Sequence, residues 1–413
     1  MRVLHECCAG LDVHKNSVYA CVRKMSEGRP KVEKRRFGTM TDDLLKLGEW
    51  LSQEGVTHAA IESTGVYWRP VHNILEGTVA IVLCNAQHVK QVPGRKSDAS
   101  DSEWLAELMQ YGLLKASFIP RPAERELREL TRTRLELVQE KTMHANQIQK
   151  VLETANIKLA SVASDVLGVS GRRILSAICN GRDNPAELAQ LAKGTLKNKE
   201  TELIRALTGR VSDHHRFLLK MHLEMVTNLE RTIDELSARI ERRMKEEQSE
   251  ALPFVAAVQL LKTMPGISDR TAQIVLGEIG LDMNRFPSAA HLSSWSGLAP
   301  GMNTSGERRK PARLKKGNVY LKSAMVQAAW AAVKKKGTSC HDLFCRVARK
   351  SGKQPAICAV AHAMLTSIYA MLKTGTVYRE ISVNQKDEIE KEKTQREIKR
   401  LKALGYEITL KTA

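Results

Sequence analysis

The sequence predicts an α/β domain followed by a long, mainly helical region. Three observations support this prediction. Residues 1–120 alternate short apolar strand segments with helical ones, and residues 121–250 contain two long charged segments with apolar residues three or four apart. Residues 251–380 then carry several further helical segments. A chain of 413 residues also exceeds what one hydrophobic core usually needs, so two or three domains are expected.

The first 120 residues show the element order of an RNase H-like fold. Strands and helices are expected in the order strand, strand, strand, helix, strand, helix, strand, at Cys7–Val13, Ser17–Val22, Lys31–Phe37, Asp42–Leu51, His58–Glu62, Val66–Leu75 and Val79–Cys84. Lys31–Phe37 alternates like an edge strand, and Thr41 is a plausible N-cap of the first helix. Val79–Cys84 is fully apolar, which is typical of a buried central strand.

Residues 121–250 predict a coiled-coil arm. The first long segment, Ala123–Leu159, places apolar residues on a rough seam, and so does the second, Phe217–Met244. Such spacing fits two antiparallel helices. Between them, Ser161–Gly209 contains short helices and turn residues and is expected to form an inserted helical lobe.

Residues 251–380 predict a second, mainly helical domain, and 381–413 predict a tail. The domain begins with a helix–turn–helix over Leu261–Gly280 and ends with helices over Val319–Lys335 and Pro355–Leu372. The apolar run Ala356–Leu372 is shorter than the roughly 20 residues of a membrane span, so we expect a buried helix and no membrane partner. The tail carries a charged helix over Lys386–Lys402.

The charge balance predicts a polyanionic partner. The net charge is +19 and the pI is near 9.6, which favours nucleic acid over the alternative of a charge that only keeps the protein soluble. Aromatic residues make up only 4% of the chain, which argues against a protein that reads single strands mainly by stacking.

The cysteines predict a reducing, cytoplasmic compartment. Eight cysteines are scattered through apolar stretches, and the N-terminus lacks the apolar core of a secretory signal. Cys340, Cys345, Cys358 and His362 allow an alternative zinc reading. Core packing is favoured, because no Cys-x2-Cys knuckle is present and Cys358 and His362 lie in the apolar helix.

Four acidic residues stand where acids are costly. Asp12 and Glu62 each end a predicted strand, and Asp98 and Asp101 begin a helix three residues apart, which places them on one face. If the two strands are neighbours, their carboxyl ends lie side by side. Clustered carboxylates repel one another unless cations neutralise them, and Mg²⁺ (or Mn²⁺) prefers oxygen ligands. Two such ions are suited to phosphodiester chemistry.

Each acid also has an ordinary structural reading. Asp12 fits a turn at a strand end, Glu62 or Asp98 fits a helix cap, and Asp101 fits a surface acid. Taken singly, these readings are as strong as the functional one. Taken together, with the strand-end placement and the basic chain, they are weaker than a metal site.

Three motifs resemble those of a known family. Gly10-Leu-Asp-Val-His-Lys15, Ile61-Glu-Ser-Thr-Gly65 and Lys96-Ser-Asp-Ala-Ser-Asp101 are similar to the acidic motifs of the DEDD transposases of bacterial insertion sequences, the IS110 type. Pilin-gene inversion recombinases are related to this type. Asn85-Ala-Gln-His-Val-Lys90 adds to the resemblance. It implies an N-terminal RuvC-like domain, of RNase H fold, in which Asp12, Glu62, Asp98 and Asp101 bind metal.

The last third extends the resemblance. Met264-Pro-Gly-Ile followed by Thr271-Ala-Gln-Ile is similar to a helix–hairpin–helix element, which can offer backbone N–H groups to a phosphate, although an ordinary packing unit fits equally well. Trp295-Ser-Gly-Leu-Ala-Pro300, Asn303-Thr-Ser-Gly306 and Lys315-Lys-Gly-Asn318 resemble the family's transposase domain. The resemblance implies that Ser305 is a nucleophile that forms a phosphoserine link to DNA. Thr304 is the adjacent alternative, and a plain loop serine is the ordinary reading.

Basic residues beside these motifs are expected to hold nucleic acid. They are Lys15, Lys90, Arg95, Lys96, Arg308, Arg309, Lys310, Arg313, Lys315 and Lys316. The resemblance implies a recombinase that moves an insertion sequence, acts on donor and target DNA, is guided by a bridge RNA that the element encodes, and assembles as a homodimer or tetramer. Two rival functions stay open. One is a metal-dependent nuclease or junction resolvase that uses water, and the other is a DNA-binding protein without enzymatic activity.

Overall fold

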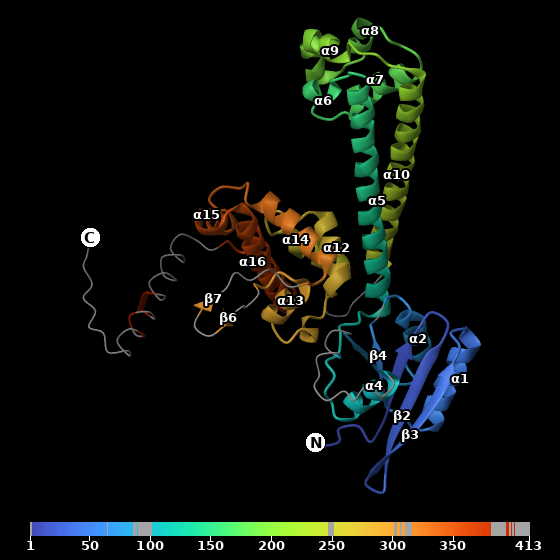
Figure 1. The fold of residues 1–413 in the computed structure, drawn as a ribbon. Helices are drawn as coiled ribbons and strands as arrows, with labels where there is room; N and C mark the ends of the chain where they lie inside the picture. The colour runs from blue at the N-terminus through green and yellow to red at the C-terminus, as the bar shows by residue number, and fades with distance from the viewer. Residues whose placement is uncertain are drawn as a thin grey trace. The chain divides into compact units, whose positions relative to one another are not determined.

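A computed structural model describes residues 2–63, 65–85, 89, 101–246, 252–300 and 316–380, the backbone of 304, 305, 308 and 309, and isolated positions at 394, 395, 398 and 400. The chain divides into two compact units, residues 1–119 and 120–413. Each unit is described by itself (Figure 1).

The first unit is a five-stranded mixed sheet with helices on both faces (Figure 1). The strand order is β3-β2-β1-β4-β5, with β1 antiparallel to β2 and parallel to β4. The strands are β1 (Cys7–Val13), β2 (Val18–Ser26), β3 (Arg29–Phe37), β4 (His58–Glu62) and β5 (Ala80–Cys84), and the helices are α1 (Thr41–Gln53), α2 (Trp68–Leu75) and α4 (Asp101–Gln110). This order confirms the RNase H-like domain that the sequence predicts.

The two faces of the sheet bury different side chains. Ala9, Leu11 and Val13 of β1 pack in a core with residues of α1 and α2. Cys8 of β1 and Ala60 of β4 pack in a separate core with residues of α4. Because side chains alternate along a strand, Gly10 and Asp12 belong to the α4 face.

Two local predictions in this unit are wrong. Thr41 is the first residue of α1 and not its N-cap, since Met40 holds the cap position without a side-chain hydrogen bond. Val79–Cys84 does not form a central strand. It gives β5 (Ala80–Cys84), which lies at the edge of the sheet beside β4. Its apolar residues reflect burial by flanking structure, because Leu83 and Cys84 are buried in two different cores.

The second unit begins with a helical hairpin in the region where the sequence predicts a coiled-coil arm. Helices α5 (Pro122–Thr154) and α10 (Asp213–Glu246) pack side by side along their length (Figure 1). At a rise of 1.5 Å per residue, each helix is about 50 Å long. Four buried residues of α10 follow a seven-residue spacing, which is that of a coiled coil: Leu219, Val226, Ile233 and Ile240.

A helical lobe joins the C-terminal end of α5 to the N-terminal end of α10 (Figure 1). Its elements are α6 (Leu159–Val162), α7 (Val169–Cys179), α8 (Pro185–Ala189), the 3₁₀ turn η1 (Gly194–Lys199) and α9 (Glu200–Leu207). The lobe has its own core, which continues into the end of α5 and the start of α10. It is therefore a small folded body, as the sequence predicts.

The rest of the unit is a helical domain. Its elements are α11 (Phe254–Lys262), α12 (Asp269–Ile279), η2 (Met283–Arg285), α13 (Ala289–Ser296), the strands β6 (Thr304–Ser305) and β7 (Arg308–Arg309), α14 (Val319–Ala332), α15 (Ser339–Ser351) and α16 (Lys353–Thr374). The sequence did not predict α15, whose only buried residue is Cys340. The predicted tail helix lies almost wholly outside the described residues.

Helix α16 is the central helix of this domain. It is long and apolar enough to cross a membrane by length and composition alone. It packs against α13, α14 and α15, and ten of its residues are buried, including Ile357, Val360 and Leu365. The predicted buried helix is thereby confirmed.

The contact between β1 and α4 generates a test of the first unit. A Cβ atom on Gly10 would lie 2.1 Å from the Ser102 carbonyl oxygen and 2.4 Å from the Ala106 nitrogen. We expect Gly10→Ala to lower the free energy of unfolding by about 1–3 kcal/mol, because the helix has to move off the strand. Denaturant unfolding of the full chain measures this.

Gly48→Ala is the matched control. Gly48 lies within α1, and an added Cβ would meet only the end of the Leu75 side chain, at 3.3 Å. Alanine favours a helix over glycine by about 1 kcal/mol, so this variant should be as stable as the parent or more so. Equal destabilisation by both substitutions would show that the close approach at Gly10 is not special.

Candidate carboxylate site and serine hairpin

Asp12 and Glu62 lie side by side at the carboxyl ends of two parallel strands. Leu11 of β1 is in register with Ile61 of β4, so the next residues of the two strands are neighbours. Adjacent strands are about 4.8 Å apart. Ala60 faces α4, and Glu62 lies two residues further on, so both acids belong to the α4 face of the sheet.

Helix α4 brings Asp101 to the same place. The helix begins at Asp101, and the next residue, Ser102, is buried against Gly10. Gly10 precedes Asp12 by two residues on the same face of the sheet. The first turn of α4 therefore lies over the end of β1 where Asp12 stands. The sequence predicts that these three acids, together with Asp98, gather at this edge.

The pKa of the Asp12 carboxyl reflects the two acids near it. Burial raises the pKa of the Asp12 carboxyl, and the charges of Asp101 and Glu62 raise it further. His14 opposes both effects, because its Nε2 lies 3.1 Å from Oδ2 of Asp12. The sequence analysis assigned His14 no role, although it belongs to the same Asp-Val-His-Lys motif.

The donor set suits a hard divalent cation by its chemistry. Carboxylates that raise one another's proton affinity also bind a cation that neutralises them. Within the described parts of the chain, no three acidic, histidine or cysteine side chains lie close enough to hold a metal ion. Asp98, the fourth predicted ligand, lies outside the described residues. Of the four predicted ligands, the structure therefore describes Asp12, Glu62 and Asp101.

Ser305 lies in a short antiparallel hairpin. Strand β6 pairs with β7, so that Thr304 is opposite Arg309 and Ser305 is opposite Arg308. In the backbone pairing, Arg308 therefore stands opposite the predicted nucleophile.

The ends of the segment that carries this hairpin are held together. A Cβ atom on Gly317 would lie 2.3 Å from the Gly297 nitrogen, so only glycine permits this approach. The backbone N–H of Asn318 donates to the Trp295 carbonyl over 3.2 Å. Two of the sequence motifs, Trp295-Ser-Gly and Lys-Gly-Asn318, are therefore one structural unit from which the hairpin extends.

A buried carboxylate links Asn318 to the arm helix α5. Glu278 of α12 is fully buried, and both its oxygens accept hydrogen bonds from Arg132 of α5, over 2.7 and 2.8 Å. Arg128 donates to the backbone carbonyls of Gly277 and Glu278. Asn318 donates to Glu278 Oε2 over 2.6 Å, while its own side-chain oxygen caps α14. Sequence reasoning missed this network, because a single acid within a helix carries no signal.

The predicted helix–hairpin–helix has a structural explanation. Gly266 has a φ of +85°, and a Cβ there would lie 2.3 Å from the Ala328 carbonyl and 2.8 Å from the Ala332 nitrogen. Glycine is therefore required because α14 packs onto the turn between α11 and α12. This contact accounts for the turn without a phosphate ligand.

The cysteine and histidine residues of the zinc alternative do not come together. Cys345 contacts His341, with Sγ 3.5 Å from Nε2, and Cys340 is buried near Glu380. No group of three metal-ligating side chains forms among the described residues, which include all four of the zinc pattern. Ser293 and Ser296 are fully buried in α13, as expected of packing residues.

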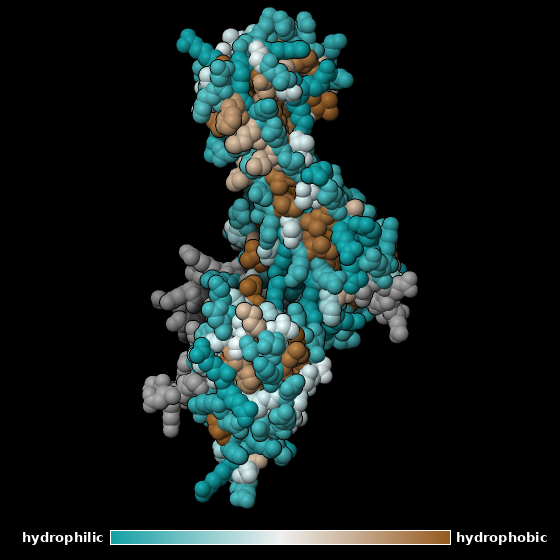
Figure 2. All heavy atoms as spheres, turned by 90° about the vertical axis from the view of Figure 1, so that its right-hand side faces the viewer, coloured by the Kyte–Doolittle hydropathy of each residue, from teal (hydrophilic) through white to brown (hydrophobic). Residues whose placement is uncertain are grey.

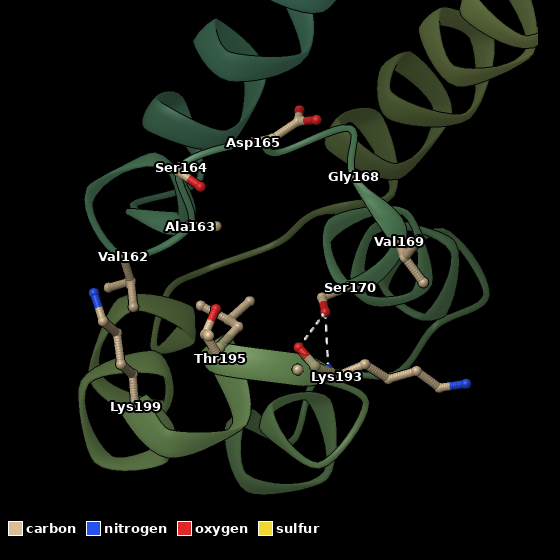
Figure 3. A pocket seen from close by; sticks show the side chains of 12 residues that line it. Val162, Ala163, Ser164, Asp165, Gly168, Val169, Ser170, Lys193, Thr195 and Lys199 are labelled. Carbon is tan, nitrogen blue, oxygen red and sulfur yellow. Dashed lines mark hydrogen bonds between the residues drawn. The ribbon is translucent and has the colours of Figure 1, made fainter.

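The helical lobe contains a hollow of about 480 Å³ (Figure 3). Ser170 Oγ bridges to the backbone of Lys193, donating to its carbonyl and accepting from its N–H. The amines of Lys193 and Lys199 lie on opposite sides of the hollow and do not converge (Figure 3). The hollow therefore assembles no charged site.

The basic residues predicted to bind nucleic acid are only partly described. Lys15 follows β1 and is exposed, and its carbonyl accepts a hydrogen bond from Thr39. Lys316 is exposed next to Gly317. Arg308 and Arg309 are described by their backbone in β7. The predictions for Lys90, Arg95, Lys96, Lys310, Arg313 and Lys315 fall outside the described residues.

Comparison with known proteins identifies the class. Residues 9–157 match the family model of the DEDD transposase domain of IS110, described as transposase. Residues 258–344 match the model described as transposase IS116/IS110/IS902 family. The strand-end acids and the order of the two segments thus define a DEDD transposase.

Two relatives agree with this class. The chain is 34% identical over 140 residues to an uncharacterised 43.6 kDa protein of the insertion element IS110 from Streptomyces coelicolor, covering 33% of this chain and 34% of that protein. It is 24% identical over 328 residues to a probable family 20 transposase from Pseudomonas aeruginosa, covering 78% of this chain and 85% of that protein. The chain belongs to the IS110 family of transposases, which are enzymes that cut and join DNA. Their DEDD domain implies the use of a divalent metal.

The Glu278 network generates a stability test. We expect Glu278→Gln to lower the free energy of unfolding by about 3–5 kcal/mol, because it removes the buried charge that pairs with the half-buried Arg128 and Arg132. The control is Glu235→Gln, which removes an exposed pair with Arg231 at 3.4 Å and should cost less than about 0.5 kcal/mol. Thermal and denaturant unfolding measure both. Similar losses in the two variants would contradict the structural role of Glu278.

Proposed function

We propose that this transposase cuts and rejoins DNA to move an insertion sequence, using its carboxylate cluster and a serine nucleophile. The single observation that carries the proposal is the meeting of Asp12, Glu62 and the start of α4 on one face of the sheet. Three acids gathered at one sheet edge suit a phosphodiester substrate once cations are bound.

The acids have a defined role in this proposal. Asp12, Glu62, Asp101 and Asp98 would hold Mg²⁺ or Mn²⁺, which supplies neutralisation of the phosphate charge when bound. His14 orients the Asp12 carboxyl through its 3.1 Å contact. The sheet and α4 keep the acids in place, so that little reorganisation accompanies catalysis.

Ser305 supplies the bond that makes rejoining possible. Its hydroxyl oxygen bonds to the phosphorus of the scissile phosphodiester, one bridging P–O bond breaks, and the leaving DNA oxygen takes up the proton. A new DNA end then attacks the phosphoserine, and the serine is released. Arg308, opposite Ser305 in the hairpin, is suited to stabilise the added negative charge.

The arm is proposed as the surface on which a second copy of this chain assembles. Three exposed apolar side chains lie on α5 and α10 in addition to the buried seam: Met143, Phe217 and Met225, which are 50%, 67% and 47% exposed. Figure 2 shows apolar surface along the arm between hydrophilic side chains. A dimer or tetramer fits strand exchange, in which several strands are cut. Guidance by a bridge RNA, on donor and target DNA, rests on the family resemblance. A cytoplasmic location rests on the scattered cysteines and the N-terminal sequence.

The serine step is tested with neighbouring hydroxyls. We expect Ser305→Ala to abolish a covalent protein–DNA adduct and strand exchange, because no other group then forms the phosphoester. Thr304→Ala is the matched control and should retain both. Adducts are measured on denaturing gels with labelled element-end DNA, Mg²⁺ and the element's RNA. An adduct that survives in Ser305→Ala and is lost in Thr304→Ala would assign the nucleophile to Thr304.

The carboxylate step is tested in the same reaction. Asp12→Asn should lower cleavage by more than about a hundredfold, because several kcal/mol of charge stabilisation depend on a bound metal. Asp42→Asn removes an exposed acid that pairs with Lys46 at 3.6 Å, and its activity should stay unchanged. Unchanged cleavage by Asp12→Asn would instead favour a protein that only binds DNA.

A nuclease that uses water is the second candidate. The same carboxylates support it, since water can replace the serine hydroxyl at the phosphorus. It predicts cleavage without an adduct in the parent protein and full cleavage by Ser305→Ala. The two readouts of the serine test separate it from recombination.

A further inference from the structure

The excess positive charge of this chain is concentrated in one region. Residues 1–119 contain 15 basic and 14 acidic residues, a net charge of +1. Residues 252–380 contain 19 basic and 6 acidic residues, a net charge of +13. Of these, residues 322–353 contribute eight basic residues and one acid, Asp342. A polyanion is therefore expected to meet the helical domain at this segment.

This segment of exposed cations is here called the α14–α15 basic surface. It consists of the end of α14, the turn after it, α15 and the start of α16. Its exposed cations are Lys334, Lys335, Lys336, Arg346, Arg349, Lys350 and Lys353. None of these seven forms an ion pair or side-chain hydrogen bond with another described residue, so each is available to a ligand.

Helix α15 is built to present this charge outward. Arg346, Arg349 and Lys350 are three and four residues apart and therefore share one face. Phe344 lies on the opposite side of the helix, where α15 packs against α16 and α14. Packing of that side accounts for the helix, and it does not account for the exposed basic residues on the other side.

An aromatic side chain stands at the α14 end of this surface. Trp330, in the last turn of α14, is 38% exposed, and Lys334 follows one helical turn later. The ring of Phe344 packs edge-on against the Trp330 ring, with the ring centroids 5.9 Å apart. An exposed aromatic ring among cations stacks on an unpaired base while the cations bind the phosphates. The bases of a duplex are already stacked on one another and do not offer such a face.

We propose that the α14–α15 basic surface binds single-stranded nucleic acid, with Trp330 stacking on an unpaired base. The low aromatic content of the chain does not oppose this, because the surface uses one tryptophan and relies on charge for most of its affinity. The surface uses neither the residues of the carboxylate motifs nor those of the Ser305 hairpin. Arg346 to Lys353 also lie beyond residues 258–344, the part that matches the family's C-terminal model. The inference rests on the proposed function only in that the protein meets nucleic acid.

Binding is measured by fluorescence anisotropy of the full chain in EDTA, so that no cleavage occurs. The probes are a labelled 15-nucleotide oligothymidylate, an oligouridylate of the same length and a 15-base-pair duplex. The triple variant K334Q/K335Q/K336Q should weaken single-strand binding on the order of tenfold and reduce the salt slope by about 2, which corresponds to roughly 0.7 per lost phosphate contact. The control K193Q/K197Q/K199Q removes three exposed lysines from the lobe and should change neither quantity.

Trp330 is tested separately from charge. Trp330→Leu should weaken single-strand binding about fivefold to a hundredfold without changing the salt slope, and should affect duplex binding less. Trp330→Phe should restore most of the affinity, which a merely structural role would not require. Matching melting temperatures show that the variants are folded. The tighter of the two single strands identifies DNA or RNA as the natural ligand.

Two results would overturn the inference. One is an equal loss of affinity in the lobe control and in the α14–α15 triple variant, which would mean non-specific attraction to a basic chain. The other is parental single-strand binding by folded Trp330→Leu. Asp12→Asn is expected to bind like the parent, so loss of catalysis and loss of this binding are distinguishable.

Discussion

The carboxylate site depends on the contact between Gly10 and the start of α4. A side chain at position 10 would occupy the space of the Ser102 carbonyl and the Ala106 nitrogen, so only glycine lets the helix lie directly on β1. This approach brings Asp101 to the end of β1. Asp12, which is two residues after Gly10, and Glu62 lie side by side there. The backbone contact thus brings the three acids together, although their negative charges repel one another.

A second buried constraint organises the helical unit. Glu278 connects Arg132 of the arm to Asn318, and Asn318 and Gly317 hold the two ends of the segment that carries Ser305. The hairpin therefore extends from a base that is anchored to α5 and α12. Both constraints use residues outside the proposed catalytic set to position the residues that are proposed to belong to it.

Much of this arrangement was predictable from sequence. Alternating apolar segments predicted the order of the strands, and three motifs predicted which acids meet, because strand ends in a parallel pair share an edge. The position of β5 was not predictable, since an apolar run looks alike at the edge and at the centre when flanking structure covers it. The long-range contacts were also not predictable from the sequence. Nothing local marks Glu278 as the partner of Arg132, or α15 as a helix, because its stability comes from packing on α16.

Asp12, Glu62 and Asp101, with Asp98, are proposed to hold one divalent metal site. Iron-mediated cleavage can locate such a site: Fe²⁺ replaces Mg²⁺, and ascorbate with peroxide then cuts the backbone next to the bound ion. We expect cuts clustered near residues 12, 62 and 98–101, suppressed by excess Mg²⁺ and lost in Asp12→Asn. Cuts at other segments, or a pattern unchanged by Asp12→Asn, would show that these acids do not hold the metal.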